Sequence, residues 1–200
     1  MDIVNSINIR KYHKCLIEKY GLGSIGALGW KAREGQETRF EMLSQIGDLN
    51  NSSVLDVGCG HGDLCGFLNK KYTRLRYIGV DLNESFLDFA IEKYSLSGET
   101  SFFLGDFTKA NLPVTDYIIA SGTLNYYNSD PNYVFKTITK LFNGCRIAFG
   151  FNILSKVDNF NSLLIAYKPQ QILEHCRTLT SNIIFKEGYY ENDFTVMMYR

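Results

Sequence analysis

The chain of 200 residues lacks the features that mark several large classes of protein. Its 21 Lys and Arg residues balance 21 Asp and Glu residues, which argues against a broad basic face for nucleic acid but leaves a local patch open. No stretch approaches the roughly 18–20 apolar residues that a membrane helix needs. Residues 1–6 do not follow the basic-then-apolar pattern of a signal peptide. We therefore expect a cytoplasmic protein with no membrane partner.

The spacing of the cysteines excludes two further classes. The five cysteines are odd in number and include no C-x-x-C pair, so neither a disulfide framework nor a zinc site is expected. We predict buried, reduced thiols and no bound metal.

Short strand-forming runs alternate with helical patterns along a chain that is 45% hydrophobic and 21% charged. This alternation predicts an α/β fold with a single doubly wound, mostly parallel seven-strand sheet and helices on both faces. A short polar turn between the last two strands predicts a C-terminal antiparallel hairpin. Residues 107–115 are too few for a crossover helix. The expected strands are 53–58, 76–82, 100–106, 116–122, 145–152, 183–190 and 194–199, and the expected helices are 3–20, 34–46, 63–71, 84–94, 131–142 and 169–179.

A glycine-rich turn at residues 58–62 is the most informative segment, because an apolar strand enters it and a helix follows it. Glycine lets the backbone bend sharply and press against a ligand, and a helix N-terminus supplies N–H groups that favour negative charge. Together they predict a nucleotide-cofactor pocket, with a purely structural turn as the alternative. Asp63 stands where the dinucleotide pattern G-x-G-x-x-G has its third glycine, so an NAD-dependent oxidoreductase is less favoured.

The run Asp56-Val57-Gly58-Cys59-Gly60-His61-Gly62 resembles motif I of the class I S-adenosylmethionine (SAM) methyltransferases, which reads acidic-x-Gly-x-Gly-x-Gly. The resemblance covers roughly residues 40–200 and includes the C-terminal hairpin. It implies a methyltransferase domain at residues 48–200, preceded by a helical lid region at residues 1–47. It also implies that the cofactor is SAM.

The resemblance assigns the methionine end of SAM to the glycine turn, where backbone N–H groups of Gly58, Cys59 and Gly60 can approach the ligand. Asp56 suits the ammonium group, or braces the turn, or does both. Cys59 could be a nucleophile, but the resembling family often carries a small residue there for packing. Ser121 should line the methyl-donor end together with the residues that follow it, up to Leu124.

The ribose and adenine are assigned to the ends of the next two strands. Asp81 suits the two ribose hydroxyls, with helix capping as the alternative. Asp106 would accept from the adenine amine while the Phe107 N–H donates to a ring nitrogen, and Leu82 would pack on the base. For Asp106 and Phe107, the alternative is an ordinary turn at the end of a strand.

The only tryptophan, Trp30, lies in a glycine-rich link between the two N-terminal helices. We consider two roles for it. Either Trp30 faces the cofactor with Arg33, Gln36 and Arg39, or it anchors the link to the core while the charged residues lie in water.

The methyl acceptor and the catalytic residue are not identified by the sequence. Residues 125–127, the loop 152–168 and the N-terminal region are expected to form the acceptor site. The aromatic side chains available for this site are Tyr12, Tyr20, Tyr126, Tyr127 and Tyr167, although they could equally belong to the core. No histidine among His13, His61 and His175 is assigned as a general base.

Three functions stay open, and oligomeric state is not predicted. The first is methyl transfer to a small-molecule substrate. The second is methylation of nucleic acid or protein, although the prolines of the DNA amino-methyltransferase motif are missing after Ser121. The third is a non-catalytic SAM-binding interaction module.

Overall fold

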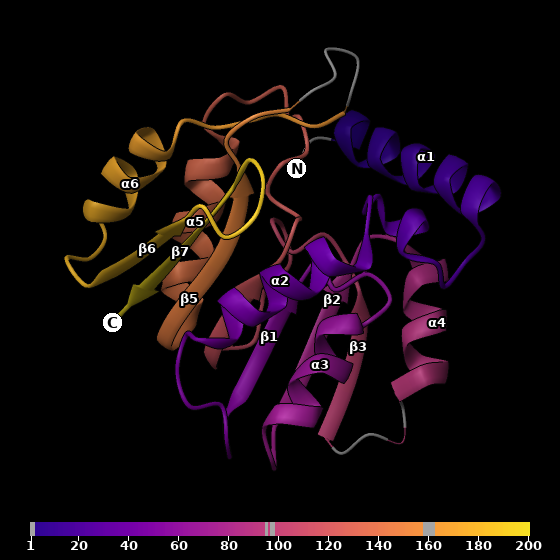
Figure 1. Cartoon of the computed structure of the whole chain (residues 1–200), viewed down its shortest axis with the longest axis horizontal. Coiled ribbons are helices and arrows are strands. Elements are labelled where there is room, and N and C mark those ends of the chain that lie inside the picture. The colour runs from indigo at the N-terminus through magenta and orange to yellow at the C-terminus, as the bar shows by residue number, and fades with distance from the viewer. Residues whose placement is uncertain (1–2, 95, 97–98, 158–162) are drawn as a thin grey trace.

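The computed structural model describes residues 3–94, 96, 99–157 and 163–200 (Figure 1). The helical elements are α1 (Ile3–Tyr20), the 3-10 helix η1 (Ile25–Leu28), α2 (Arg33–Ser44), α3 (Asp63–Lys71), α4 (Glu84–Tyr94), α5 (Tyr133–Gly144) and α6 (Pro169–Arg177). The strands are β1 (Ser53–Val57), β2 (Arg76–Asp81), β3 (Glu99–Leu104), β4 (Thr115–Ala120), β5 (Cys145–Leu154), β6 (Ile183–Glu187) and β7 (Asp193–Tyr199).

The strands form one seven-strand sheet in the order β3-β2-β1-β4-β5-β7-β6. The first five strands pair in parallel, and β7 lies antiparallel between β5 and β6. The predicted α/β fold and its C-terminal hairpin are confirmed. The link between β3 and β4 contains no helix, as its length predicts.

Alternate side chains of the central strands pack on opposite faces of the sheet. Leu55 and Ile118 belong to the cluster covered by α5 and α6, whereas Val54 and Ile119 belong to the cluster covered by α2 and α3. This alternation follows from the two-residue period of a strand. Both faces of β1 and β4 are therefore buried, which is why their sequences are almost continuously apolar.

Predicted element ends differ from the structure by a few residues. Strand β5 continues to Leu154, because its last residue pairs with Asp193 at the start of β7. Strand β6 ends at Glu187, just before Gly188 turns the chain with a φ of 76°. None of the described helices has the length and apolar content that a membrane span needs.

The glycine-rich link before α2 is tightly turned. Ser24 Oγ accepts a hydrogen bond from Ala27 N at 3.2 Å and begins η1, and Gly29 ends η1 with a φ of 85°. The link folds back on α1 and lies over the ends of β1 and β4, where α1 also passes (Figure 1). This arrangement brings the N-terminal residues to the glycine turn.

Candidate functional site

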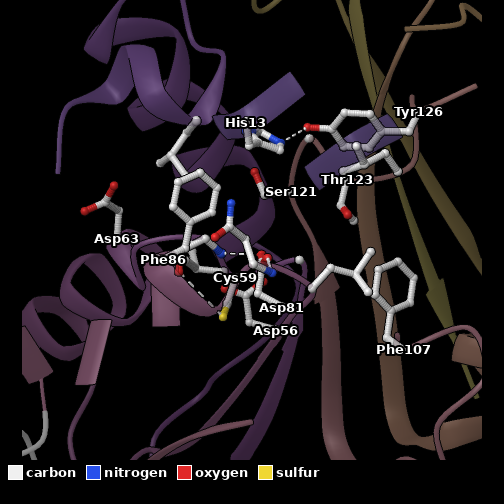
Figure 2. A pocket seen from close by; sticks show the side chains of 18 of the residues that line it. His13, Asp56, Cys59, Asp63, Asp81, Phe86, Phe107, Ser121, Thr123 and Tyr126 are labelled. Carbon is white, nitrogen blue, oxygen red and sulfur yellow. Dashed lines mark hydrogen bonds between the residues drawn. The ribbon is translucent and has the colours of Figure 1, made fainter. Parts of the chain in front are cut away.

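A pocket lies at the carboxyl ends of β1, β2 and β4, the position at which open α/β sheets bind ligands. We call it the turn pocket, because the glycine turn after β1 forms its floor. Figure 2 shows side chains from α1, the glycine turn and the loop after β4 pointing into it. Several residues that the sequence analysis proposed as cofactor-binding line this pocket. They are Trp30, Asp56, Gly58, Cys59, Gly60, Asp81, Leu82, Phe107 and Ser121.

The turn has left-handed backbone at its three glycines, and two of these line the pocket. Gly58 and Gly60 have φ values of 74° and 52°, in the left-handed region that other residues rarely adopt. A Cβ on Gly58 would lie 2.3 Å from Thr123 Oγ1, and one on Gly60 would lie 2.6 Å from Leu28 Cδ2. Side chains at these positions would therefore fill the floor of the pocket.

The backbone N–H groups of the turn are already used within the protein. Gly58 N and Cys59 N both donate to Val80 O, at 2.7 and 3.1 Å, and Gly60 N donates to Asp81 Oδ2 at 2.8 Å. These hydrogen bonds join the turn to β2. The predicted contact of the same groups with a ligand stays a prediction.

Asp56 is a buried carboxyl group at the end of β1. It accepts a hydrogen bond from Tyr77 Oη, and only 2% of its surface is exposed. Burial raises the pKa of Asp56 to about 7, against a smaller opposing effect of the Tyr77 hydrogen bond. A cation near Asp56 would lower that pKa again and stabilise the ionised form.

Asp81 is tied to the backbone on both sides. Besides Gly60 N, it accepts from Asn83 N at 2.8 Å. Burial raises its pKa, and the two backbone hydrogen bonds oppose that rise. Asn83 Oδ1 in turn accepts from Ser85 N at 3.1 Å, so Asn83 caps the start of α4.

A hydrogen-bonded pair closes one side of the turn pocket. Tyr126 Oη lies 2.7 Å from His13 Nε2, and His13 Nδ1 lies 3.0 Å from Ala27 O (Figure 2). This pair joins α1, η1 and the loop after β4. Burial lowers the pKa of His13, which favours its neutral form.

Leu28 at the end of η1 and Trp30 in the link before α2 line the turn pocket. A Cβ on Gly122 would lie 2.7 Å from the Trp30 ring, and the remaining cavity has a volume of about 90 Å³. A second cavity of about 360 Å³ adjoins it and shares Leu28, Trp30, Gly122 and Tyr126 with it. We call this second space the aromatic cavity, because Tyr12, Trp30, Tyr126 and Tyr190 line it.

Comparison with known proteins agrees with this geometry. A family model described as a methyltransferase domain matches residues 54–143. Magnesium-protoporphyrin O-methyltransferase of Rhodobacter capsulatus is 30% identical over 128 residues, which are 62% of this chain and 55% of that protein. Malonyl-[acyl-carrier protein] O-methyltransferase of Neorickettsia risticii is 33% identical over 105 residues, 52% of this chain and 38% of that protein. The chain thus matches about half or less of the length of these relatives.

The fold is that of solved methyltransferases. Magnesium protoporphyrin IX methyltransferase of Synechocystis PCC 6803, crystallised with SAM, superposes with a TM-score of 0.73 at 17% identity. The alignment covers 100% of this chain and 98% of that one. Residues 54–143 thus match a methyltransferase domain, and the chain has the fold of solved class I SAM-dependent methyltransferases. The solved structures of the Synechocystis protein contain SAM or SAH, so the charge of the turn pocket can be compared with that of SAM.

The charge of the turn pocket suits the cofactor. Its described lining carries three carboxyl groups, Asp56, Asp63 and Asp81, against one cation, Arg10. SAM carries a positive sulfur and an ammonium group, which favour such a lining. Gln36 also lines the pocket and donates to Asp63 Oδ2 at 3.3 Å.

Several expected residues lie elsewhere. Asp106 is not part of the pocket lining, and its Oδ1 accepts from Thr108 N and Thr108 Oγ1 at 3.0 and 2.6 Å. Leu124 is in the core, and Arg33 is exposed. Arg39 lines only the aromatic cavity. Residues 158–162 of the expected acceptor loop lie outside the described residues.

Two side chains of the turn that could take part in chemistry, Cys59 and His61, are buried in the protein. Burial raises the pKa of the Cys59 thiol well above its ordinary value, which disfavours the nucleophilic thiolate. His61 is 1% exposed, and its ring packs on Phe86 and Phe89 with centroid distances of 4.7 and 4.9 Å. Burial lowers the pKa of His61 to about 4. Neither residue is placed to act on a substrate.

The contacts that the sequence did not predict all join distant segments. Tyr77 reaches Asp56 from the neighbouring strand, and His13 reaches Tyr126 across 113 positions. Tyr190 in the β6–β7 turn and Asp193 at the start of β7 both line the aromatic cavity. No local pattern signals these contacts, because each depends on how the segments pack.

Proposed function

We propose that this methyltransferase binds SAM in the turn pocket and transfers its methyl group to a small molecule held in the aromatic cavity. One observation carries the proposal: the carboxyl-lined turn pocket adjoins the aromatic cavity along four shared residues. The name of the Rhodobacter capsulatus relative describes O-methylation of a small molecule, which supports an acceptor of that kind.

We assign the polar end of SAM to β1 and its ribose to β2. Asp56 is placed to attract the ammonium group, since it is buried at the floor of the pocket. Asp81 keeps lone pairs for the ribose hydroxyls, because each carboxylate oxygen can accept more than the one backbone hydrogen bond it has.

We assign the adenine to the side of the pocket lined by Leu82 and Phe107, which offer apolar surface. Asp106 remains part of this proposal, although its side chain points into its own turn in the structure. Ser121 and Thr123 also line the turn pocket, and Gly122 between them lines both cavities.

Residues 1–47 are proposed to act as a lid over the cofactor and residues 48–200 as the domain that holds it. The lid residues Leu28 and Trp30 leave only about 90 Å³ in the turn pocket. Ligand pockets usually measure about 300–1,000 Å³, so entry of SAM requires these side chains to move. After closure they would exclude water from the boundary between the two cavities.

SAM supplies a methyl group on a positively charged sulfur, which is already a strong donor. The protein residues therefore need mainly to orient the acceptor and exclude water. Trp30, Gly122 and Tyr126 form the boundary at which the acceptor would meet the cofactor.

Thermal melts with SAM, with its demethylated product S-adenosylhomocysteine (SAH) and with NAD test the proposal. A ligand at 100 times its Kd stabilises the folded state by about 2.7 kcal/mol. For a chain of this size the melting temperature then rises by roughly 5–10 °C. We expect that shift with SAM and SAH and none with NAD.

Two variants locate the site. Asp81→Ala should weaken SAH binding about 10- to 100-fold, because it removes hydrogen bonds to a charged acceptor. Asp88→Ala, an exposed position on α4, is the matched control and should bind as the original protein does. Equal SAH affinity in both variants would refute the ribose assignment, and a shift with NAD alone would refute the proposed function.

A further inference from the structure

Helix α1 has one face buried against the protein and the opposite face exposed. Asn5, Ile9 and His13 are buried, and their spacing of four residues places them on the inward face of the helix. Positions 3, 7, 11 and 14 follow the same helical spacing on the opposite side, and all four are exposed. Figure 1 shows α1 beyond the ends of the strands, at the edge of the molecule. We call the exposed row the outer stripe, and its residues are Ile3, Ile7, Lys11 and Lys14.

The first two turns of the outer stripe are apolar. Ile3 is 68% exposed and Ile7 is 44% exposed, and the neighbouring Val4 is 57% exposed. Residues three and four positions apart are neighbours on a helix, so these three side chains form one continuous patch. Such a patch favours a covering surface, because burial removes apolar area from water.

The turns that follow are basic. Helix α1 carries four cations, Arg10, Lys11, Lys14 and Lys19, against one carboxyl group, Glu18. Within the described part of the chain, Arg10, Lys11 and Lys14 form no ion pair. Because the whole chain has a formal net charge of zero, α1 concentrates positive charge at one edge of the molecule. A helix of this kind attracts an anionic partner.

Apolar and basic side chains on one stripe fit an anionic lipid surface better than nucleic acid. The boundary of a bilayer offers acyl chains to the isoleucines and anionic headgroups to the lysines. Nucleic acid offers phosphates, but its backbone has no apolar layer for three aliphatic side chains. A helix that lies on a bilayer needs neither a spanning length nor a signal sequence, which were the grounds for expecting no membrane partner.

We propose that the outer stripe docks the protein on an anionic lipid surface. Ile3, Val4 and Ile7 enter the boundary of the acyl chains, and Lys11 and Lys14 contact the headgroups. On its inward face, the same helix contributes to the lining of the turn pocket and of the aromatic cavity. Docking therefore places both cavities beneath a helix that lies on lipid. The proposal concerns binding alone and does not depend on methyl transfer.

Co-sedimentation of the full chain with vesicles tests this proposal. One kind of vesicle is phosphatidylcholine alone, and the other contains about 30% phosphatidylglycerol, which is anionic. In low salt we expect at least about tenfold tighter binding to the anionic vesicles, and at about 0.5 M salt most of that difference should disappear through screening. Equal binding to both kinds of vesicle, or no binding to the anionic kind, would overturn the proposal.

A charge variant tests the basic part of the outer stripe. Lys11→Gln with Lys14→Gln should weaken binding to anionic vesicles about 10- to 30-fold, because each cation near such a surface contributes about fivefold. Arg177→Gln with Lys186→Gln is the matched control, since it removes two exposed cations from α6 and β6. The control should bind as the original protein does. An equal loss in both double variants would assign binding to overall charge and contradict the role of α1.

A second variant tests the apolar part. Ile7→Ser should weaken binding to anionic vesicles about 3- to 10-fold, because it removes apolar area from the contact. Ile91→Ser on α4 is the matched control, since Ile91 is 45% exposed and Ile7 is 44% exposed. Unchanged binding of Ile7→Ser would contradict entry of the patch into the acyl boundary. A dimer in lipid-free solution that Ile7→Ser dissociates would show that a second copy of the chain covers the patch, and would also contradict the proposal.

SAH binding is measured on the same proteins. Each variant should keep the SAH affinity of the original protein, because none of the exchanged residues lines the turn pocket. Intact SAH binding without a preference for anionic vesicles refutes this inference and leaves the proposed function standing. A preference for anionic vesicles without SAH binding refutes the proposed function and leaves this inference standing.

Discussion

The turn pocket and the aromatic cavity share four residues but are built in different ways. The floor of the turn pocket is formed by consecutive residues after β1 and by the ends of neighbouring parallel strands, and α1, the link before α2 and α2 line its other sides. Its described charged lining is mostly acidic. The aromatic cavity is lined by α1, the link before α2, α2, the loop after β4, the end of β5 with the residues after it, and the β6–β7 turn. Three of the five charged side chains in its described lining are basic. The floor of the turn pocket is therefore set by local sequence, whereas the aromatic cavity is set by tertiary packing.

The largest expected effect comes from a variant that changes the wall of the aromatic cavity and leaves the turn pocket intact. Arg39→Met leaves Asp193 buried without its ion pair, which costs about 3–5 kcal/mol of unfolding free energy. Because Arg39 does not line the turn pocket, the thermal shift with SAH should persist. Chemical denaturation with and without SAH measures both quantities.

The double variant Arg39→Met, Asp193→Asn is the control for this prediction. It removes the unpaired charge and should recover part of the lost stability. A loss below about 1 kcal/mol in the single variant would show that the ion pair does not hold the cavity wall.

The next prediction concerns a variant that changes the turn pocket and leaves the aromatic cavity intact. Because burial raises the pKa of Asp56 to about 7 from 3.8, the folded protein holds that proton more readily and loses stability as the pH rises through about 7. Asp56→Asn removes the buried charge and should raise the unfolding free energy by roughly 1–3 kcal/mol at about pH 8. The same variant should bind SAM more weakly, because it lacks the carboxylate.

Denaturation below about pH 4 is the internal control, because Asp56 is then protonated in both the folded and the unfolded state and the two proteins should differ little. A variant that is less stable than the original protein at about pH 8 would contradict the raised pKa. Asp88→Asn on the exposed face of α4 controls for a general effect of charge.

A smaller effect concerns the pH dependence of cofactor binding. With its pKa at about 7, Asp56 ionises as the pH rises from about 5.5 to about 7, and the affinity for SAM should rise roughly tenfold over that range. Calorimetric titration at several pH values measures this slope. Asp56→Asn should flatten it, and an equal slope in the variant would assign the titration to another group.

The smallest effect concerns the boundary that joins the two cavities. Tyr126→Phe removes one hydrogen bond and leaves His13 Nε2 without it, which costs roughly 0.5–1.5 kcal/mol. The affinity for SAH should change less than threefold, since Tyr126 touches only the edge of the turn pocket. Urea denaturation and SAH titration measure the two effects. A loss above tenfold in SAH affinity would show that the pair belongs to the cofactor site instead.

The sequence predicted the fold and the floor of the turn pocket because both depend on short patterns. The alternation of strands and helices, the glycine turn at residues 58–62 and the position of Asp81 after β2 can all be identified within windows of about 25 residues. The sequence did not show that Gly58 N and Cys59 N are occupied by Val80 O, because that contact depends on the register of β1 against β2.

The aromatic cavity was only partly predictable. Tyr12 and Tyr126 were expected near the acceptor and line the cavity, whereas Tyr20 and Tyr127 are exposed. Tyr190 was not expected, because it reaches the cavity through the turn between β6 and β7. Its contact with Arg39 spans 151 positions, and no single-sequence pattern reports such a distance.

A crystal structure of the protein soaked with SAH tests the central claim most directly. The account predicts electron density in the turn pocket, with the ribose hydroxyl groups within hydrogen-bond distance of Asp81 and the adenine between Leu82 and Phe107. It also predicts that Leu28 and Trp30 have moved away from the glycine turn. Density for SAH at any other place, or an unchanged turn pocket at saturating SAH, would contradict the account.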